Sequence, residues 1–324
     1  MKTSWQQGLD SLIESGTAKS TRRAHVRDLR YFAEWLALSC DLELNYPVAL
    51  EHVIGFIVEH AISMPRQVQV TLITRGLKKK AAPLSPRTIR RMLGSLSAMH
   101  TEKGVTNPCA HDQVRLLLKK LTVASTYQAR KKVAITAPIL DALLLTCGDS
   151  VVDLRDRALL QFAVTTGGRR RSELSNMLVE ALEPIDGGYL VSIDHSKSDQ
   201  AGEGRRVPLL GKAAIDVKAW LVASGIRKGK LFRGIHRSGT LRAGIAGDTI
   251  NRIVKRRATL AGFDEKHFSA HCLRSGFITQ AGRQAVHVRD AMALSLHSDI
   301  VVAQGYYNDA ELLANPASHV FEKD

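Results

Sequence analysis

The sequence contains few cysteines and no long apolar run. Its 324 residues include four scattered cysteines, Cys40, Cys109, Cys147 and Cys272, without the Cys-x-x-Cys spacing of a metal or redox site. They predict small buried side chains in a reducing compartment and argue against a disulfide framework. No apolar stretch approaches the roughly 18 residues of a membrane span, and the N-terminus lacks the apolar core of a signal peptide. We expect a soluble, cytoplasmic protein without membrane contact.

Patterns that would hold a metal are also scarce. His267 and His271 have the i,i+4 spacing that could place two imidazoles on one helix face. No acidic general base lies between them, and no third ligand is evident. We therefore expect neither a metal nor another cofactor, and no internal repeat stands out.

Positive charge, in contrast, is abundant. There are 46 Lys and Arg residues against 31 Asp and Glu, for a net charge of +15. Such an excess favours a polyanionic partner, because each neutralised phosphate releases condensed counterions. Charge alone does not choose between DNA, RNA and an anionic membrane. Residues 1–125 carry 18 basic and 10 acidic side chains, and residues 126–324 carry 28 and 21, so both halves could contact the same polyanion.

The length leaves room for two domains, and residues 1–125 are predicted to be all-helical. Apolar residues recur at helical spacing, and Ser85-Pro86 has the cap and first-turn proline that begin a helix. The predicted helices cover 19–37, 48–63, 85–104 and 110–122. In the third of these, Arg87, Arg90 and Arg91 form one basic face, which is either a DNA contact or a solvated surface.

Residues 126–136 have weak periodicity and a basic run, which indicates a linker to a second domain, 137–324. In that domain, 188–194 and 205–210 are β-like and flank a polar loop, which predicts a small antiparallel sheet. Helices are expected at 138–147, 152–166, 212–225, 248–262 with Asp248 as N-cap, 269–282 and 287–296. The predicted fold class is mainly α with a small antiparallel β-sheet, an α+β arrangement.

Two clusters of the second domain combine arginine with a second functional group. A glycine pair, Gly167-Gly168, precedes three arginines, and Glu173 lies three residues after Arg170. The guanidinium fork suits a phosphate, and the carboxylate could orient it; the alternative is a solvated turn with an i,i+3 ion pair. His271 and Arg274 would share one helix face, where an anion would relieve their like charge. The alternative there is a neutral core histidine beside a surface arginine.

Two further clusters supply groups that can transfer protons or attack phosphorus. Lys197 lies in the loop between the predicted strands. It is either a solvated lysine or, if the loop reaches an active site, a proton donor whose pKa neighbouring arginines lower. Tyr306 follows His297 by nine residues, and Ser298 and Asp299 can end one helix and cap the next. A buried structural tyrosine is the alternative, and Tyr307 is the direct competitor for the role of nucleophile.

These residues in this order resemble the tyrosine recombinases, also called the phage integrase family, over about residues 135–310. Ser172-Glu173-Leu174 matches the family's Ser-Glu-Leu and sets the register on Arg170. The sequence departs from the family where an apolar residue commonly precedes that arginine, because Arg169 stands there. Leu296 replaces the glycine that commonly precedes the last histidine, and Ser275 stands where histidine is frequent.

The resemblance implies a fold, a partner and a reaction. A helical core-binding domain and a catalytic domain would close around double-stranded DNA, and Tyr306 would attack a phosphate to give a 3′-phosphotyrosyl bond and a free 5′-hydroxyl. The implied roles are phosphate-oxygen binding by Arg170, Arg274 and His297, base catalysis by His271, acid catalysis by Lys197, and orientation of Arg170 or His271 by Glu173.

The resemblance also implies a homo-tetramer on DNA, a tail over 308–324 that packs on a neighbouring protomer, and a possible role for accessory DNA-bending proteins. Further candidate DNA contacts lie on one predicted helix, at Asn251, Lys255 and Arg256. Two other functions remain open at this point. One is a type IB topoisomerase that relaxes DNA as a monomer, and the other is a non-catalytic DNA-binding protein on the same fold.

Overall fold

The computed structural model describes residues 16–124, 132–193, 204–297 and 299–311. The chain divides into two compact units, Met1–Ala129 (unit 1) and Arg130–Asp324 (unit 2). The division falls inside the segment predicted as a linker, 126–136. Each unit is described by itself.

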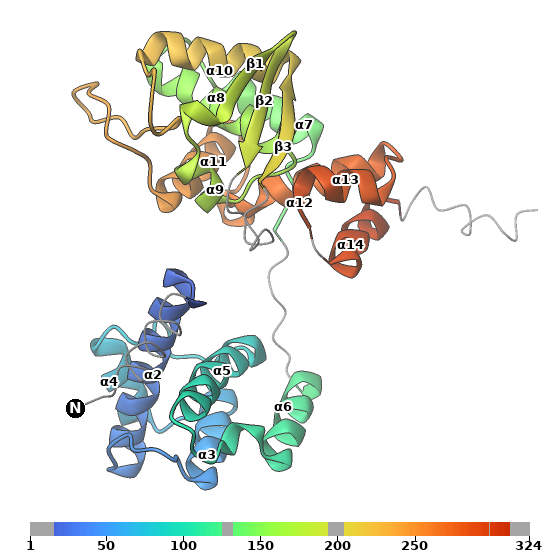
Figure 1. Cartoon of the computed structure of the whole chain (residues 1–324). Coiled ribbons are helices and arrows are strands. Elements are labelled where there is room, and N and C mark those ends of the chain that lie inside the picture. The colour runs from blue at the N-terminus through green and yellow to red at the C-terminus, as the bar shows by residue number, and fades with distance from the viewer. Residues whose placement is uncertain (1–15, 125–131, 194–203, 298, 312–324) are drawn as a thin grey trace, which may run out of the picture. The chain divides into compact units, whose positions relative to one another are not determined.

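Unit 1 is helical in its described part (Figure 1). Its helices pack around a core of aromatic and aliphatic side chains that includes Trp35, Phe56 and Leu96, each 0% exposed. The helices are α2 (Lys19–Cys40), α3 (Leu50–Ala61), α4 (Arg66–Thr74), α5 (Pro86–Glu102) and α6 (Asp112–Ala124), with a 3₁₀ turn at Pro108–Ala110. The four predicted helices are confirmed, and α4 was not predicted.

Local signals explain where α5 begins. The Ser85 hydroxyl accepts a hydrogen bond from the Thr88 backbone N–H at 3.2 Å, and Pro86 occupies the first turn. Two apolar residues within the predicted helical spans 19–37 and 48–63 are exposed rather than buried: Val26 at 69% and Ile62 at 73%. Ile62 lies outside the core because α3 ends at Ala61.

A neutral histidine lies inside the core of unit 1. The His60 ring contacts the Phe56 carbonyl through Nδ1 at 2.7 Å and the Tyr31 hydroxyl through Nε2 at 3.0 Å. Burial, and to a smaller extent the charge of Lys78, lowers the pKa of His60 to about 3. The imidazole is therefore uncharged at neutral pH and acts as a hydrogen-bonded core residue.

Unit 2 joins a three-stranded antiparallel sheet to a set of helices, which confirms the predicted fold class. The sheet order is β1-β2-β3, formed by β1 (Leu182–Ile185), β2 (Gly188–Ile193) and β3 (Arg205–Leu210). β1 was not predicted. The helices are α7 (Ala137–Leu145), α8 (Val151–Thr165), α9 (Arg171–Asn176), α10 (Gly211–Ser224), α11 (Gly247–Leu260), α12 (His271–Arg283), α13 (Val288–Ser295) and α14 (Ile300–Glu311), with 3₁₀ turns at Val179–Ala181 and Glu265–His267.

The packing of unit 2 places α12 at its centre. α8 and α10 pack on each other and on the sheet, while α12 contacts α8, α13 and α14 (Figure 1). Part of the predicted linker belongs to this unit: Ile135 donates its N–H to the Cys272 carbonyl at 3.0 Å and is 1% exposed. A Cβ on Gly276 would lie 2.0 Å from the Ile135 carbonyl oxygen, so glycine is required where this segment crosses α12.

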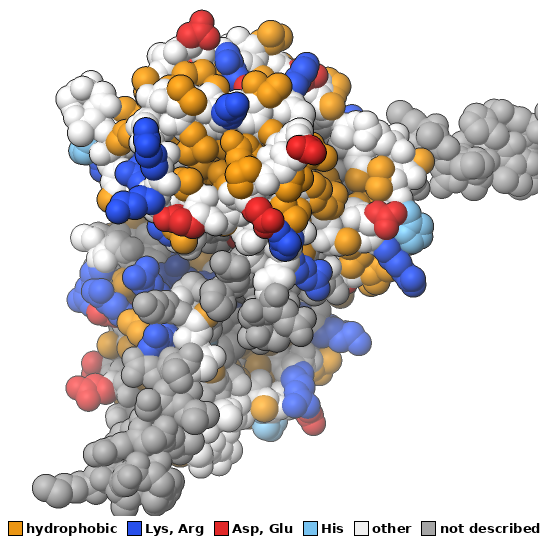
Figure 2. All heavy atoms as spheres, turned by 45° about the horizontal axis from the view of Figure 1, so that its top comes forward, with side chains coloured by type: hydrophobic (Ala, Val, Ile, Leu, Met, Phe, Trp, Pro, Cys, Tyr) orange, Lys and Arg blue, Asp and Glu red, His pale blue; other side chains and the backbone are white. Residues whose placement is uncertain are grey.

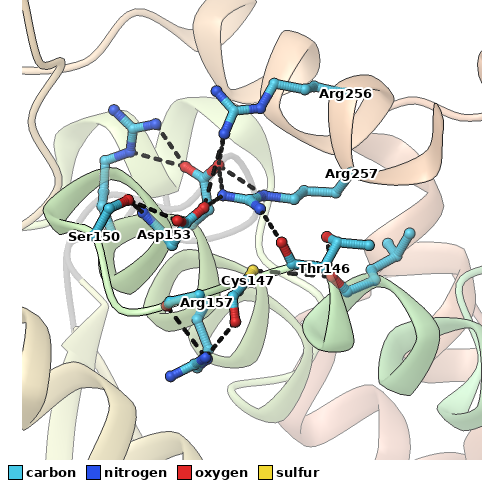
Figure 3. A network of polar contacts seen from close by, with 11 residues as sticks. Thr146, Cys147, Ser150, Asp153, Arg157, Arg256 and Arg257 are labelled. Carbon is cyan, nitrogen blue, oxygen red and sulfur yellow. Dashed lines mark hydrogen bonds and ion pairs between the residues drawn. The ribbon is translucent and has the colours of Figure 1, made fainter. Parts of the chain in front are cut away.

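A buried ionic network ties α11 to α8 (Figure 3). Arg257, 0% exposed, donates to Asp156 through Nε at 2.9 Å and Nη2 at 2.7 Å, and to the Thr146 carbonyl through Nη1 at 2.7 Å. Arg155 binds the other oxygen of Asp156. These bonds fix α11 against the helix that leads into the glycine turn.

Charged side chains are spread over the face of unit 2 shown in Figure 2, around an area of hydrophobic side chains. Exposed hydrophobic residues occur on the sheet and on α10, for example Leu210 at 50% and Ile215 at 66%. Over the described residues, the structure contains no helix of the length and apolarity needed to cross a membrane. Cys147 and Cys272 are buried as predicted, whereas Cys40 and Cys109 are only partly buried.

Candidate active site

The glycine pair brings the turn after α8 into contact with α12 and α13. Gly167 and Gly168 have φ angles of +97° and +73°, which side-chain-bearing residues rarely adopt. A Cβ on Gly167 would lie 2.3 Å from the Leu294 carbonyl oxygen, and a Cβ on Gly168 would lie 2.5 Å from the Arg274 Cα. The pair is therefore required by conformation and by space, and it fixes where the three following arginines begin.

The three arginines have different surroundings. Arg170 donates from Nη1 to Glu173 Oε1 at 2.8 Å, and its backbone N–H donates to Glu173 Oε2 at 3.1 Å. Its side chain stays 31% exposed. Arg169 is 0% exposed, and Arg171 is 57% exposed and pairs with Asp248 at 2.8 Å. Of the three, Arg170 alone combines partial access with a mostly buried carboxylate partner: Glu173 is 9% exposed, whereas the Asp248 partner of Arg171 is 88% exposed. This difference favours the predicted register.

His271 and Arg274 both lie at the start of α12, as predicted. Their burial is the opposite of the alternative, which was a buried histidine beside a surface arginine. Arg274 is 3% exposed, whereas His271 is exposed. Arg274 donates from Nη1 to the carbonyls of Gly168 at 3.2 Å and Ser295 at 2.5 Å. Its Nη2 has no hydrogen-bond acceptor among the described residues. Burial, followed by the charge of Arg170, lowers the pKa of Arg274 to about 10, so the guanidinium remains charged.

His297 completes this group. Arg274 Nε donates to His297 Nε2 at 3.1 Å, so Nδ1 carries the ring proton and donates to the Ser295 hydroxyl at 2.7 Å. Burial, then the charges of Arg274 and Arg170, lower the pKa of His297 to about 4. Partial burial and the same two arginines also lower the pKa of His271. Both imidazoles are therefore neutral at physiological pH, and His271 can accept a proton.

Leu296, which stands where the family commonly has glycine, takes a left-handed conformation with φ of +56°. This conformation costs a residue with a side chain about 1–2 kcal/mol. The leucine is 3% exposed and packs in the main core of unit 2, and such burial contributes about 1.5–3 kcal/mol. Core packing thus offsets the strain, and the turn that presents His297 forms without glycine.

Tyr306 lies on α14, the helix that Asp299 caps. The Asp299 carboxylate accepts from the Val301 N–H at 2.9 Å and the Val302 N–H at 3.3 Å, as the sequence predicts. Ser298, predicted to act with it, lies outside the described residues.

Tyr306 is partly buried and close enough to Arg274 to contribute to the pKa of that guanidinium. Tyr307 is 6% exposed in a small core with Ile278 and Ala291. The burial of the two phenols therefore favours Tyr306 as the reactive one.

Lys197 lies outside the described residues, as does the rest of the loop 194–203. The strands on either side are present: β2 ends at Ile193, and β3 begins at Arg205.

Glu173 contacts Arg170 rather than His271, so the first of the two partners predicted for this carboxylate is the one observed. Asp248 is not the N-cap of α11, because the helix begins at Gly247 and Asp248 lies in its first turn.

Most of the candidate DNA contacts have partners within the chain. On α11, Asn251 accepts from the Ala270 N–H at 2.9 Å, Lys255 lies 3.7 Å from Glu265, and Arg256 lies 3.8 Å from Asp153. On α5, the contacts differ. Arg90 donates to the Leu118 carbonyl at 2.7 Å, Arg91 pairs with the buried Asp28, and Arg87 is exposed without a partner among the described residues.

Sequence reasoning missed a basic groove in unit 1. It has a volume of about 640 Å³ and is lined mainly by arginines of α2 and the end of α4. The lining residues include Arg22, Arg23, Arg27, Arg30 and Arg75. Along α2, i, i+4 and i+7 spacing places Arg23, Arg27 and Arg30 on one helix face. The same kind of spacing predicts the basic face of α5, so this second basic face could also be predicted from the sequence.

No group of three or more His, Cys, Asp and Glu side chains is placed to hold a metal ion within the described ranges. The two histidines with i,i+4 spacing do not share a helix, because His267 ends a 3₁₀ turn and His271 begins α12. The charges that face the site are instead those of arginines.

The chain thus joins a helical unit to an α+β unit in which arginines and a histidine meet at one glycine turn. A family model described as "Phage integrase family" matches residues 134–312. The chain therefore belongs to the phage integrase family, the tyrosine recombinases.

Relatives and solved structures agree with this placement. The chain is 26% identical over 321 residues to an integrase/recombinase XerD homologue of Selenomonas ruminantium, covering 94% of this chain and 86% of the relative. It is 26% identical over 306 residues to tyrosine recombinase XerD of Vibrio vulnificus, covering 93% and 89%. By fold it is similar to the Tn1549 transposon integrase bound to transposon right end DNA, with a TM-score of 0.62, 15% identity, and 96% of each chain covered. It is also similar to a lambda integrase dimer bound to a core site, with a TM-score of 0.58, 15% identity, and coverage of 94% and 95%.

Proposed function

We propose that this chain is a site-specific recombinase that breaks and rejoins DNA strands through a covalent bond between Tyr306 and a 3′-phosphate. One observation carries the proposal: Arg170, Arg274 and His297 converge on the glycine turn from three separate elements, and Tyr306 lies on the helix packed against α12. The relatives named as recombinases and the solved structures of family members with DNA support DNA as the partner.

In the proposed reaction, the Tyr306 oxygen attacks phosphorus and its proton passes to neutral His271. The bond from phosphorus to the 5′-oxygen breaks, and Lys197 gives a proton to that leaving oxygen. Arg170 and Arg274 hold the non-bridging oxygens and stabilise the charge of the pentavalent transition state. His297 joins them as a donor once its ring proton moves from Nδ1 to Nε2, with Nδ1 then accepting from the Ser295 hydroxyl. Glu173 orients Arg170 through the two hydrogen bonds described above. Rejoining reverses these steps with a 5′-hydroxyl from the partner strand, so the phosphodiester energy is kept.

The protonation states and hydrogen bonds of the site support these roles. The lowered pKa of His271 leaves its imidazole free to accept the phenol proton. The buried Arg274 keeps an Nη2 without an acceptor among the described residues, and its charge is desolvated, so a phosphate oxygen would interact with it strongly.

Four protomers would assemble on DNA, and the tail over 308–324, of which 312–324 lie outside the described residues, would pack on a neighbouring protomer. Accessory DNA-bending proteins would act on some substrates, and the enzyme would work in the cytoplasm on the nucleoid. In unit 1 we assign DNA contacts to Arg87, Arg90 and Arg91, and the arginine groove on α2 adds a second basic surface. In unit 2, Asn251, Lys255 and Arg256 remain the proposed contacts of α11.

The test is covalent capture on nicked DNA. The wild-type protein is incubated with a pool of nicked duplexes whose arms are randomised, so that the freed 5′ fragment diffuses away and the adduct accumulates. We expect a denaturation-resistant protein–DNA adduct, which Tyr306→Phe abolishes and Tyr307→Phe retains. The recovered DNA identifies the target site. Cleavage should persist in excess chelator, because arginines rather than a metal carry the charge.

Two outcomes would contradict this function. Absence of any adduct indicates a DNA-binding protein without strand cleavage. Relaxation of a supercoiled plasmid that lacks the recovered site, without exchange between two copies of the site, indicates a topoisomerase.

A further inference from the structure

The least expected side chain beside the site is Arg169. It stands where the family commonly has an apolar residue, and it is 0% exposed. Burying a cation costs several kcal/mol unless it is paired and hydrogen-bonded. The cost of burying the Arg169 charge is only partly offset. Its Nε and Nη1 have no hydrogen-bond acceptor in the described part of the chain, although Nη1 lies 3.7 Å from the carboxylate oxygen Glu173 Oε2. An apolar residue would occupy the same position without this cost.

The contact that Arg169 does make is with the end of α13. Its Nη2 donates to the Leu294 carbonyl, one of the last carbonyls of the helix. Arg274 Nη1 donates to the next carbonyl, that of Ser295, at 2.5 Å. Two buried arginines therefore cap consecutive carbonyls at a helix C-terminus, where positive charge is favourable. His297 follows two residues later.

Space for this contact comes from the glycine turn. A Cβ on Gly167 would lie 2.3 Å from the Leu294 oxygen and 2.8 Å from Arg169 Nη2. Glycine at 167 therefore permits the guanidinium and the carbonyl to meet. The backbone N–H of Arg169 donates to the Ala163 carbonyl at 2.8 Å, which fixes the arginine to the end of α8.

We propose that Arg169 is a positioning residue of the DNA-cleaving site, a buried cation that holds the end of α13 against the glycine turn and so keeps His297 beside Arg274. The inference rests on the proposed function, since it assigns the residue to the same reaction. Arg169 touches no reacting atom in this account. It acts through the Leu294 carbonyl on the position of His297, and through its charge on the protonation of that imidazole.

The charge contribution has a measurable consequence. Burial, Arg274, Arg170, His271 and Arg169 all lower the pKa of His297. Arg169 itself stays charged, because burial, together with the charge of Arg170, lowers its pKa only to about 10. Removing the charge should therefore raise the pKa of His297, and so should any movement of α13 that exposes the imidazole or takes it away from Arg274, because burial and Arg274 are the larger causes of the lowered value. An unchanged pKa would mean that Arg169 affects neither the position nor the electrostatic surroundings of His297.

The test compares three substitutions of the full chain. Arg169→Met removes charge and donor, Arg169→Gln keeps a donor without charge, and Arg169→Lys keeps both. The pKa of His297 is measured by NMR on histidine-labelled protein, and cleavage is measured in a single turnover on the nicked duplex recovered by covalent capture. Arg171→Met is the matched control, since Arg171 is 57% exposed and pairs with Asp248.

We expect Arg169→Met to cleave about 10- to 100-fold more slowly and to raise the pKa of His297. Arg169→Gln should raise this pKa as well, whereas Arg169→Lys should keep it at the wild-type value and recover part of the rate. Arg171→Met should change neither quantity. If Arg169→Met does not fold, Arg169→Gln and Arg169→Lys still allow a neutral and a charged side chain to be compared at this position.

Wild-type cleavage by Arg169→Met, or an unchanged His297 pKa in both neutral variants, would overturn the proposal. A rate loss shared by all three variants with no change in that pKa would reduce Arg169 to a packing role. Because the NMR measurement needs no DNA, it remains decisive even if the wild-type chain forms no covalent adduct, which would instead refute the proposed function.

Discussion

The ionic network around Arg257 gives the sharpest stability prediction. Arg257→Met removes the donors to Asp156, to Asp153 and to the Thr146 carbonyl (Figure 3). Asp156, 0% exposed, would retain Arg155, which binds its other oxygen, and a distant contact with the exposed Arg256 at 3.9 Å. Breaking a buried ion pair on one side costs about 3–5 kcal/mol, because the remaining charge stays buried. For a unit of this size, that loss corresponds to a fall in Tm of roughly 6–20 °C.

Arg256→Met is the matched control from the next position of the same helix. Arg256 is 53% exposed and lies 3.8 Å from Asp153 and 3.9 Å from Asp156. Exposed pairs at such distances contribute about 0–1 kcal/mol, so its Tm should move by no more than a few degrees. Differential scanning calorimetry at fixed pH and salt measures both variants. Equal shifts for the two variants, or no shift for Arg257→Met, would show that the buried ion pairs of Arg257 do not stabilise this unit.

Three further predictions concern the site, the groove and the core of unit 1. Arg170→Gln should lower single-turnover cleavage about 100-fold or more while sparing most DNA binding, and Arg171→Gln should cleave normally; the opposite result would move the register. Replacing Arg23 and Arg30 together with Gln should reduce the slope of log affinity against log salt by about 2, and an unchanged slope would exclude the groove from the DNA contact. Burial of His60, with a folded-state pKa near 3 against an ordinary value of 6.5, means that the unfolded state binds the proton first as pH falls. Stability should therefore be intact above about pH 6.5 and should fall by roughly 4–5 kcal/mol towards pH 3, with a smaller loss in His60→Gln; urea unfolding across this range measures it, and equal losses in both proteins would contradict it.

The sequence predicts the elements whose signals are local. Ser85-Pro86 marks the start of α5, and Asp299 caps α14, because both caps act within three residues. α4 was missed because only Val68 and Leu72 of its nine residues are buried, so its periodicity is weak. β1 was missed for a similar reason: its four residues include a proline, and only Leu182 is buried.

The candidate site follows the same distinction. The order of the candidate residues and the proposed register on Arg170 come from short motifs that can be read along the chain. The burial of Arg169 and the bond from Arg91 to Asp28 could not, because they depend on contacts 125 and 63 residues apart. The three arginines of the run look alike in sequence. Only tertiary packing distinguishes Arg170, held by Glu173, from the buried Arg169 and from Arg171, which forms an exposed ion pair.

Tyr306 is the residue that we propose to become covalently bound to DNA. The adduct formed on the nicked duplex is digested with nuclease and trypsin, and the peptide that carries the remaining nucleotide is fragmented in a mass spectrometer. Both tyrosines lie in one peptide between Arg289 and Lys323, so fragmentation must separate them. We expect the nucleotide on Tyr306, the partly buried phenol near Arg274. A nucleotide on Tyr307, or on any other residue, would contradict this expectation.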